Sequence, residues 1–485
     1  MYNIEIKIIK NRIIADRFTP VEAYSKFKDK EYSFLLESVE KGQSGRYSFL
    51  GFTPFRVYKI YKDKLTILER TREEKYKIKK NHKTDQPLEF IKKEKNRFKL
   101  SENIKGLAGG GFIGYLGYEC IHEWENLDFR NPGYNNIPVG ILFLPDELIV
   151  IDHKYKTADI LKLVFRQAGK LLNGPNPEGR VEEIEKRLTG SAPVLENIKF
   201  SSRKNIKLKS NFSQKEYIKR VKNIKNDINN GEIIQAVFSQ RLQTEKKVAS
   251  FNYYRALRVI NPSPYMFYLK FKNFKLCGSS PEIMVKVTEN KAHLRPIAGT
   301  RPRGEDSNKE KKLARDLKND VKEKAEHIML VDLGRNDLGK ICKYGTVKVE
   351  KLMNIEKYSH VMHMVTDVTG ILKKNIDSVD VFKACFPAGT VSGAPKIRAI
   401  EIIEREEEIS RGPYAGSVGF FTFNGDMNTG IAIRTMLITD NKVYVQAGAG
   451  IVADSVPDKE FTETRDKARA LLEAVKLGNN GLGGK

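Results

Sequence analysis

The stretch that organises this chain runs from residue 448 to residue 466 and reads Gly-Ala-Gly-Ile-Val-Ala-Asp-Ser-Val-Pro-Asp-Lys-Glu-Phe-Thr-Glu-Thr-Arg-Asp. Its two glycines predict a turn with exposed backbone N–H groups, and Pro457 and Asp458 suit the first turn of a following helix. Glu460 and Glu463 are three residues apart and therefore share one helix face. Exposed amides beside paired carboxylates favour a site where a hard cation such as Mg²⁺ bridges an anionic substrate. A solvated helix start with ordinary surface glutamates is the alternative.

The composition limits the classes of protein to which this chain can belong. The chain has 485 residues, of which 40% are hydrophobic, so it can bury a sizeable core in two domains or in one large one. Its 86 Lys and Arg outnumber its 61 Asp and Glu, for a net charge of +25. The basic residues are scattered and are not interleaved with aromatic residues. A lysine-rich surface is therefore favoured over a nucleic-acid-binding protein, which stays the alternative from another class. The reason for the high positive charge stays open.

Targeting and redox features point to one compartment. The N-terminus has no signal-peptide pattern, and no apolar run approaches the roughly 20 residues of a membrane span. The four cysteines, at positions 120, 277, 342 and 385, form no C-x-x-C pair, which fits a reducing environment. We therefore expect a cytoplasmic protein without a membrane or nucleic-acid partner.

The chain divides by composition into regions. Its first part reads as short strands, expected at 34–36, 47–50 and 142–151, mixed with helices. The segment 168–210 reads as a loop at 173–179, a short helix at 181–188 and a polar, basic stretch at 195–210. We expect an N-terminal region at 1–167, a linker at 168–210, a larger region at 211–477 and a flexible tail at 478–485.

The larger region alternates helices and strands. Ser213 and Glu216 form a capping box at the start of a helix that ends at Gly231. Further helices are expected at 309–333, 394–407 and 457–476, and strands at 233–242, 418–423, 430–438 and 442–447. This order predicts an α+β fold, with antiparallel sheets packed as a sandwich, helices on the outside, and the N-terminal region intertwined with the larger one.

Two glycine-rich segments have different meanings. Residues 109–114 match G-x-G-x-x-G, but the run continues as Tyr-Leu-Gly-Tyr-Glu instead of a helix. A glycine-rich strand with close backbone packing is therefore favoured over a dinucleotide site. Residues 386–396 form a glycine- and hydroxyl-rich loop that runs into a helix, and Thr390 there suits contact with an anion.

Several polar residues are candidates for chemistry, each with an ordinary alternative. Gly299 and Thr300 lie in a segment with two arginines that suits carboxylate recognition or a basic surface turn. Glu326 is a third carboxylate for the metal or a plain helix glutamate. His363, three residues after His360, fits a general acid or base, a core pair or, least well, a zinc half-site. Arg434 is flanked by apolar residues, and a buried charge without a partner is costly.

Taken together and in order, these segments of 211–475 resemble the chorismate-utilising enzymes, and among them most closely component I of anthranilate synthases. That family converts the dicarboxylate chorismate with the help of Mg²⁺. The resemblance implies that Glu326 and Glu463 are Mg²⁺ ligands with Glu460 beside them, and that His363 assists pyruvate elimination with Thr390 in the same pocket. It also implies chorismate contacts by Gly299, Thr300, Tyr414, Arg434, Gly448, Ala449 and Gly450. The chain departs from the family pattern at Val456 and Thr462, neither of which is an implied ligand.

Two positions separate members of the resembled family. Relatives that add water to the ring have a lysine base where this chain has Gln235, and relatives that make aminodeoxychorismate have a nucleophilic lysine where it has Ala298. The implied activity is therefore a lyase reaction, the first committed step of tryptophan biosynthesis. Ammonia adds at ring C2 with loss of the C4 hydroxyl, and pyruvate then leaves to give anthranilate. Component I of aminodeoxychorismate synthase, in the folate pathway, is the nearest alternative.

The resemblance also implies regulation and a partner. The family's tryptophan feedback site corresponds here to Glu37, Ser38, Arg46, Pro264, Tyr265 and Met266, and inter-region packing is the alternative. No cysteine lies in the Gly-x-Cys-x-Gly turn of class I amidotransferases. Ammonia is therefore expected from solution or from a separate glutamine amidotransferase subunit, component II.

Overall fold

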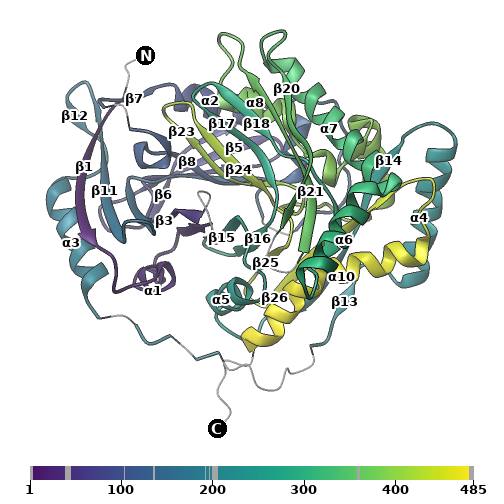
Figure 1. Cartoon of the computed structure of the whole chain (residues 1–485). Coiled ribbons are helices and arrows are strands. Elements are labelled where there is room, and N and C mark those ends of the chain that lie inside the picture. Colours follow the sequence, from purple (N-terminus) through teal and green to yellow (C-terminus); the bar gives the residue numbers. More distant parts are fainter. Residues whose placement is uncertain are drawn as a thin grey trace.

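The computed structural model describes residues 4–38, 45–102, 104–134, 137–191, 193–195, 197–198, 206–357 and 361–479. Within these residues the chain builds two large sheets that face each other, with helices along their outer faces (Figure 1). No described helix is long and apolar enough to cross a membrane. His360 and most of the expected C-terminal tail lie outside the described residues.

The first sheet joins both ends of the chain. Its path β13-β14-β26-β25-β16-β15-β2-β3-β10-β11-β1-β7 is antiparallel except where β1 meets β7, and β12 and β22 pair at its sides. In chain order its described strands are β1 (Ile4–Ile14), β2 (Ser33–Glu37), β3 (Tyr47–Phe52), β7 (Phe98–Leu100), β10 (Glu147–Asp152), β11 (Thr157–Gln167), β12 (Lys170–Leu171), β13 (Lys209–Ser210), β14 (Gln235–Glu245), β15 (Tyr265–Lys270), β16 (Lys275–Ser280), β22 (Gly393–Ala394), β25 (Thr435–Ile438) and β26 (Lys442–Ile451).

The second sheet is also shared. Its path is β19-β21-β18-β17-β24-β23-β8-β9-β4-β5-β6, and β20 pairs with β21. Its described strands are β4 (Arg56–Ile60), β5 (Lys64–Arg70), β6 (Tyr76–Lys83), β8 (Gly111–Leu116), β9 (Gly140–Leu144), β17 (Ile283–Thr288), β18 (Lys291–Leu294), β19 (Ile297–Pro302), β20 (Lys348–Lys357), β21 (Val361–Ile371), β23 (Ser417–Thr422) and β24 (Met427–Ile431).

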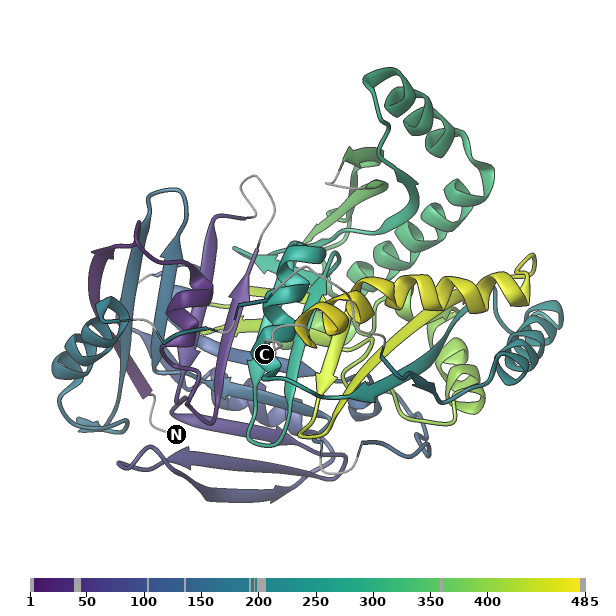
Figure 2. The same ribbon diagram turned by 90° about the horizontal axis from the view of Figure 1, so that it is seen from below.

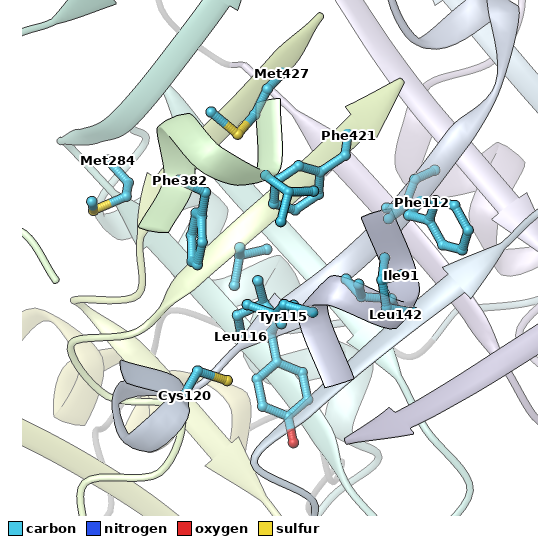
Figure 3. Close-up of a cluster of buried hydrophobic side chains, with 14 of the residues drawn as sticks. Ile91, Phe112, Tyr115, Leu116, Cys120, Leu142, Met284, Phe382, Phe421 and Met427 are labelled. Atoms are coloured by element: carbon cyan, nitrogen blue, oxygen red, sulfur yellow. The ribbon is translucent and has the colours of Figure 1, made fainter. Parts of the chain in front are cut away.

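The main core lies between the two sheets. Phe34 of β2 stacks on Phe143 of β9, with ring centroids 6.3 Å apart, and Phe143 also meets Phe271 beyond β15 at 5.3 Å. Figure 3 shows the part of this core where Phe421 and neighbouring strand residues meet Phe382 of helix α8 (Ser378–Cys385). Because strands from the first 170 residues and from the last 270 contribute to one core, the two regions are intertwined.

Helices cover the outer faces. A second core lies between the first sheet and helices α1 (Pro20–Ser25), α3 (Pro177–Thr189), α5 (Ser250–Ile260) and α10 (Pro457–Asn479). Helices α4 (Gln214–Asn229) and α9 (Lys396–Glu406) cover its other end, and α2 (Pro87–Lys95) packs beside α8. Helix α6 (Ser307–Asn319) projects from the body, and α7 (Val321–Ile341) runs from it back to the body, where it packs on α8 (Figure 2). The α+β sandwich with outer helices is therefore confirmed.

Two local expectations are borne out in detail. Ser213 and Glu216 make the reciprocal capping-box hydrogen bonds at the start of α4. The glycine-rich run forms β8, where a Cβ at Gly114 would lie 1.9 Å from the Ile141 carbonyl oxygen. The run is thus a closely packed strand, and it is followed by a short 3-10 helix at Tyr118–Glu123 instead of the α-helix that a dinucleotide site requires.

Other expectations were wrong, and the corrections share a cause. The strand expected at 142–151 is two strands, β9 and β10, which belong to different sheets. The strand expected at 430–438 is likewise β24 and β25, separated by Arg434 with a left-handed φ of +47°. In both places an apolar run crosses from one sheet to the other, and both halves are buried.

The helix expected at 309–333 is also two elements. Asp320 ends α6, and its carboxylate accepts the Glu323 N–H as the N-cap of α7. The short helix expected at 181–188 is confirmed as α3, which begins earlier, at Pro177, and packs on β1 and β11. The boundaries at 167 and 210 stay a prediction.

Candidate active site

The stretch at 448–466 differs from its expected form in one respect. Gly448 and Gly450 lie inside β26, paired with β14, and form no turn; the turn comes later, before α10 begins at Pro457. A Cβ at Gly448 would lie 2.9 Å from the Tyr414 hydroxyl oxygen, and one at Gly450 would lie 2.5 Å from Nε2 of Gln235. The glycines are therefore needed to make room for two neighbouring side chains of the candidate site.

Ala449 faces away from these two glycines. Its side chain is fully buried in the core beneath α4 and α9, because alternate residues of a strand point to opposite faces. Any contact of Ala449 with a ligand would be made by its backbone.

One lysine, Lys467, pairs with Glu463 and acts electrostatically on the carboxylates of Glu282, Glu326 and Glu460. Lys467 of α10 donates to the Gly448 carbonyl over 3.1 Å and pairs with Glu463 at 2.8 Å. Burial raises the pKa of Glu326 on α7, the neighbouring charges of Glu323 and Glu463 raise it further, and Lys467 opposes them. Burial also raises the pKa of Glu460. The two helices thus bring their acids into electrostatic range of each other.

This cluster suits a hard cation. Within the described residues no three His, Cys, Asp or Glu side chains are arranged to hold a metal ion. Mg²⁺, however, is commonly held by one or two carboxylates together with water and substrate oxygens. Glu326 and Glu463 supply oxygen donors whose mutual repulsion a cation would relieve, so the donor chemistry fits the group.

The strand pair β19–β21 positions three expected residues together. Thr300 lies opposite His363 in the register, and a bulge there places Gly299 at a φ of +69°. Nδ1 of His363 lies 3.0 Å from the Gly299 carbonyl oxygen and 3.1 Å from the Thr300 hydroxyl. Since a carbonyl only accepts, Nδ1 carries the proton and Nε2 is the basic atom of the neutral ring. Burial lowers the pKa of His363, so the neutral form is favoured.

Arg434 is a partly buried cation that pairs with no carboxylate among the described residues. Burial lowers its pKa, with no opposing anion, and its charge also lowers the pKa of His363. Among the described residues its side chain makes one long hydrogen bond, from Nη1 to Asn261 Oδ1 at 3.4 Å, and pairs with no acid. Because an unpaired charge that is largely removed from water is costly, this guanidinium suits an anionic ligand.

Three further expected residues, Gln235, Tyr414 and Thr390, have the following surroundings. Gln235 of β14 is buried and its Oε1 has no hydrogen-bond partner among the described residues. Tyr414 lies under Gly448 with Arg411 at 5.6 Å from its ring. Thr390 donates to Oε1 of Glu282 over 2.9 Å.

Glu282 and Arg411 are two residues that the sequence argument missed. Burial raises the pKa of Glu282 to about 7, opposed by Thr390 and Lys467, so this carboxyl can hold a proton near neutral pH. Arg411 is fully buried. It pairs with Glu407 at 2.7 Å and donates to the carbonyls of Val391 and Val237, beside Thr390 and within β14. No local pattern marks Glu282, whereas Arg411 precedes Gly-Pro-Tyr414 and could have been found as that tyrosine's neighbour.

The expected inhibitor residues gather at the junction of the two regions. Glu37 lies opposite Met266 where β2 pairs with β15, and its carboxylate accepts from Tyr254 and Arg258. The Ser38 hydroxyl is buried and has no partner among the described residues. Arg46 lies on the other side of β2 and is paired with Asp152 at 2.7 Å.

Comparison with known proteins places this arrangement in a family. A model of the chorismate binding enzyme family matches residues 31–473, so the chain belongs to that family. The chain is 42% identical to anthranilate synthase component 1 of Acetivibrio thermocellus, covering 96% of this chain and 94% of the relative. It is 41% identical to anthranilate synthase component 1 of Aquifex aeolicus, covering 98% and 96%. The crystal structure of anthranilate synthase component I from Streptococcus pneumoniae TIGR4 superposes with a TM-score of 0.77 at 32% identity, covering 95% and 99%.

Proposed function

We propose that the chain is the large subunit of an anthranilate synthase, which converts chorismate and ammonia to anthranilate, pyruvate and water. The observation that carries this proposal is Arg434, a partly buried guanidinium that lacks a carboxylate among the described residues and lies in electrostatic range of His363. Chorismate has two carboxylates. One suits Arg434 and its neighbours, and the other suits a cation held by Glu326 and Glu463, with Glu460 beside them. Such a cation, Mg²⁺ in this proposal, would neutralise a substrate carboxylate and act as a Lewis acid when bound.

The chain's own residues suit a two-step reaction. Gln235 offers an amide where a lysine base would activate water, which fits ammonia as a nucleophile that needs no strong base. Glu282, whose raised pKa lets it hold a proton near neutral pH, would give this proton to the departing C4 hydroxyl. The neutral His363, with Nε2 as its basic atom, would take the ring proton as pyruvate leaves.

Ammonia requires a source outside this chain. The four cysteines are buried, and burial raises the pKa of each thiol, so none is suited to act as a glutaminase nucleophile. A separate glutamine amidotransferase component would supply ammonia, in keeping with the name component 1 that the relatives carry. Tryptophan is the proposed inhibitor at the β2–β15 junction, where the unpartnered Ser38 hydroxyl and the Glu37 carboxylate offer polar contacts.

One assay tests the activity directly. Purified chain is mixed with chorismate, Mg²⁺ and an ammonium salt, and anthranilate is followed by fluorescence and pyruvate by a coupled reaction. We expect equal amounts of both products, loss of activity with a chelator, and no activity when glutamine replaces ammonium. An aminated product without pyruvate would instead support an aminodeoxychorismate synthase, and no turnover at all would refute the proposal.

A further inference from the structure

Two glutamates of one short helix hold different parts of the chain. The helix is the 3-10 helix Tyr118–Glu123, which follows β8 in the N-terminal region. The carboxylate of Glu119 accepts the backbone N–H groups of Arg411 and Gly412, over 2.7 and 3.0 Å. The carboxylate of Glu123 accepts the backbone N–H of the second residue of α2, over 2.9 Å. Burial raises the pKa of both carboxyls, to about 7 for Glu119 and about 8 for Glu123, so both are largely removed from water.

The backbone that Glu119 holds belongs to a turn at 411–414. Within it the Arg411 carbonyl accepts the Tyr414 N–H over 3.2 Å, and Gly412 has a left-handed φ of +58°. The Gly412 carbonyl in turn accepts a backbone N–H from the short helix over 2.8 Å. Both polar backbone groups of Gly412 are therefore bonded to the N-terminal region.

The same turn carries a candidate chorismate contact. A Cβ at Gly448 would lie 2.9 Å from the Tyr414 hydroxyl oxygen, so this hydroxyl lies directly against β26. The Arg411 guanidinium reaches β14, where it donates to the Val237 carbonyl over 2.5 Å. The guanidinium thus fixes the end of the Arg411 side chain, whereas the carboxylate of Glu119 fixes its backbone.

We propose that Glu119 is a positioning residue of the chorismate site, because it holds the turn at 411–414 so that the Tyr414 hydroxyl lies where the substrate binds. The proposal rests on the proposed function. Glu119 acts through the turn and not by contact with the substrate. Hydrogen bonds to a carboxylate are stronger than those between neutral groups, and its removal leaves two backbone donors without their acceptor. Since 292 positions separate Glu119 from Arg411, the N-terminal region completes the site of the larger region.

Three variants separate the roles of the two glutamates. Glu119→Ala removes the acceptor of both N–H groups. Glu119→Gln keeps one oxygen for the Arg411 N–H but places an NH₂ group near the Gly412 N–H. Glu123→Ala is the matched control, because it removes a carboxylate of the same short helix that accepts a backbone N–H outside the turn.

Steady-state kinetics of the full chain with chorismate, ammonium and Mg²⁺ give the first readout. For Glu119→Ala we expect KM for chorismate to rise about tenfold, with kcat and KM for ammonium within about twofold of wild type, because a contact made equally to bound substrate and to the transition state affects binding alone. Glu119→Gln should raise KM for chorismate about threefold, because one of the two acceptors remains. Glu123→Ala should leave all three constants within about twofold of wild type, although it too loses a buried hydrogen bond.

Two further readouts distinguish positioning from a general loss of stability. In a Tyr414→Phe background, Glu119→Ala should raise KM for chorismate by no more than about a further twofold, because both changes act on the same hydroxyl contact. Amide hydrogen exchange of a peptide that contains residues 411–416 should be faster in Glu119→Ala than in the wild type, and unchanged in Glu123→Ala.

Three results would overturn the proposal: a wild-type KM for chorismate in Glu119→Ala, an equal rise of this KM in Glu123→Ala, or full additivity of Glu119→Ala and Tyr414→Phe. Should Glu119→Ala fail to fold, Glu119→Gln replaces it in every measurement, and a wild-type KM in that variant is then the contrary result. A wild type that makes no anthranilate would refute the proposed function instead, and the two failures are thereby distinguished.

Discussion

Two buried clusters of charge show opposite arrangements. In the N-terminal region Asp146 and Glu147 are fully buried, and Arg70, Lys162 and Arg180 pair with them at 2.7 to 3.8 Å. Burial alone would raise the pKa of Glu147, but Lys162, Arg70 and Arg180 together hold it well below its usual range. Each acid of this cluster is therefore paired with at least two cations.

The charges of the candidate site are not all paired in this way. The pKa values of Glu282, Glu326 and Glu460 are raised, and Arg434 has no acid beside it among the described residues. Lys467 pairs with Glu463, but Arg434 makes no ion pair with any of these acids, although pairing would stabilise both groups. The difference indicates that the first cluster serves folding, whereas the second is kept for a charged ligand.

The largest effect is expected from removing the unpaired cation. Arg434→Met should lower kcat/KM for chorismate by about 10³-fold, because a buried contact to a charged ligand is lost. Its unfolding free energy should be unchanged or higher, since a buried charge without a partner is removed. Steady-state kinetics and denaturant titration check both values. Wild-type kinetics would show that Arg434 does not contact the substrate.

The same substitution in the paired cluster should have the reverse outcome. Arg70→Met leaves Asp146 short of a partner and should cost about 3–5 kcal/mol of unfolding free energy. The fraction that stays folded should keep wild-type kcat, because the cluster lies in the N-terminal region. Denaturant unfolding with an activity assay per folded molecule measures this, and a loss of kcat with full stability would contradict the contrast.

A smaller effect concerns pH. The pKa of Glu282 is raised from 4.5 to about 7 in the folded chain, so between these values only the unfolded chain releases the proton. Stability should therefore fall as pH rises from 4.5 to 7, by about 3 kcal/mol in total. Glu282→Gln should remove this loss, so that it gains stability over the wild type at pH 8 but not at pH 4. Glu147→Gln is the control with the opposite sign, because the lowered pKa of Glu147 stabilises the fold above that pKa. If the unfolding free energies of the wild type and of Glu282→Gln change with pH in parallel, the raised pKa of Glu282 is contradicted.

The smallest effect links the two regions. Tryptophan bound at the β2–β15 junction should loosen chorismate binding, and chorismate should loosen tryptophan binding by the same factor, typically about 5- to 150-fold. Ser38→Ala or Met266→Thr should weaken the inhibition without changing activity in the absence of tryptophan. Ser101→Ala, beyond the far edge strand of the same sheet, is the control. Calorimetry with an unreactive chorismate analogue measures the coupling, and unchanged inhibition in both variants would leave the junction as packing only.

Short-range patterns in the sequence were sufficient to predict several elements. The capping box of α4, the start of α10 at Pro457 and the closely packed strand β8 all depend on residues a few positions apart, whose conformational preferences act locally. The resemblance of successive motifs to the family also identified Gly299, Thr300 and His363 as site residues. The structure brings these three residues into contact.

Only the tertiary structure decided the rest. The runs at 142–151 and 430–438 look like single strands, because an apolar run does not reveal that the chain changes sheets within it. The glycines at 448 and 450 suggest a turn, and only the packing of Tyr414 and Gln235 explains them inside a strand. Glu282 has no local mark at all. Its raised pKa comes from burial beside Thr390, more than 100 residues away, and such long-range burial is a property of the folded chain alone.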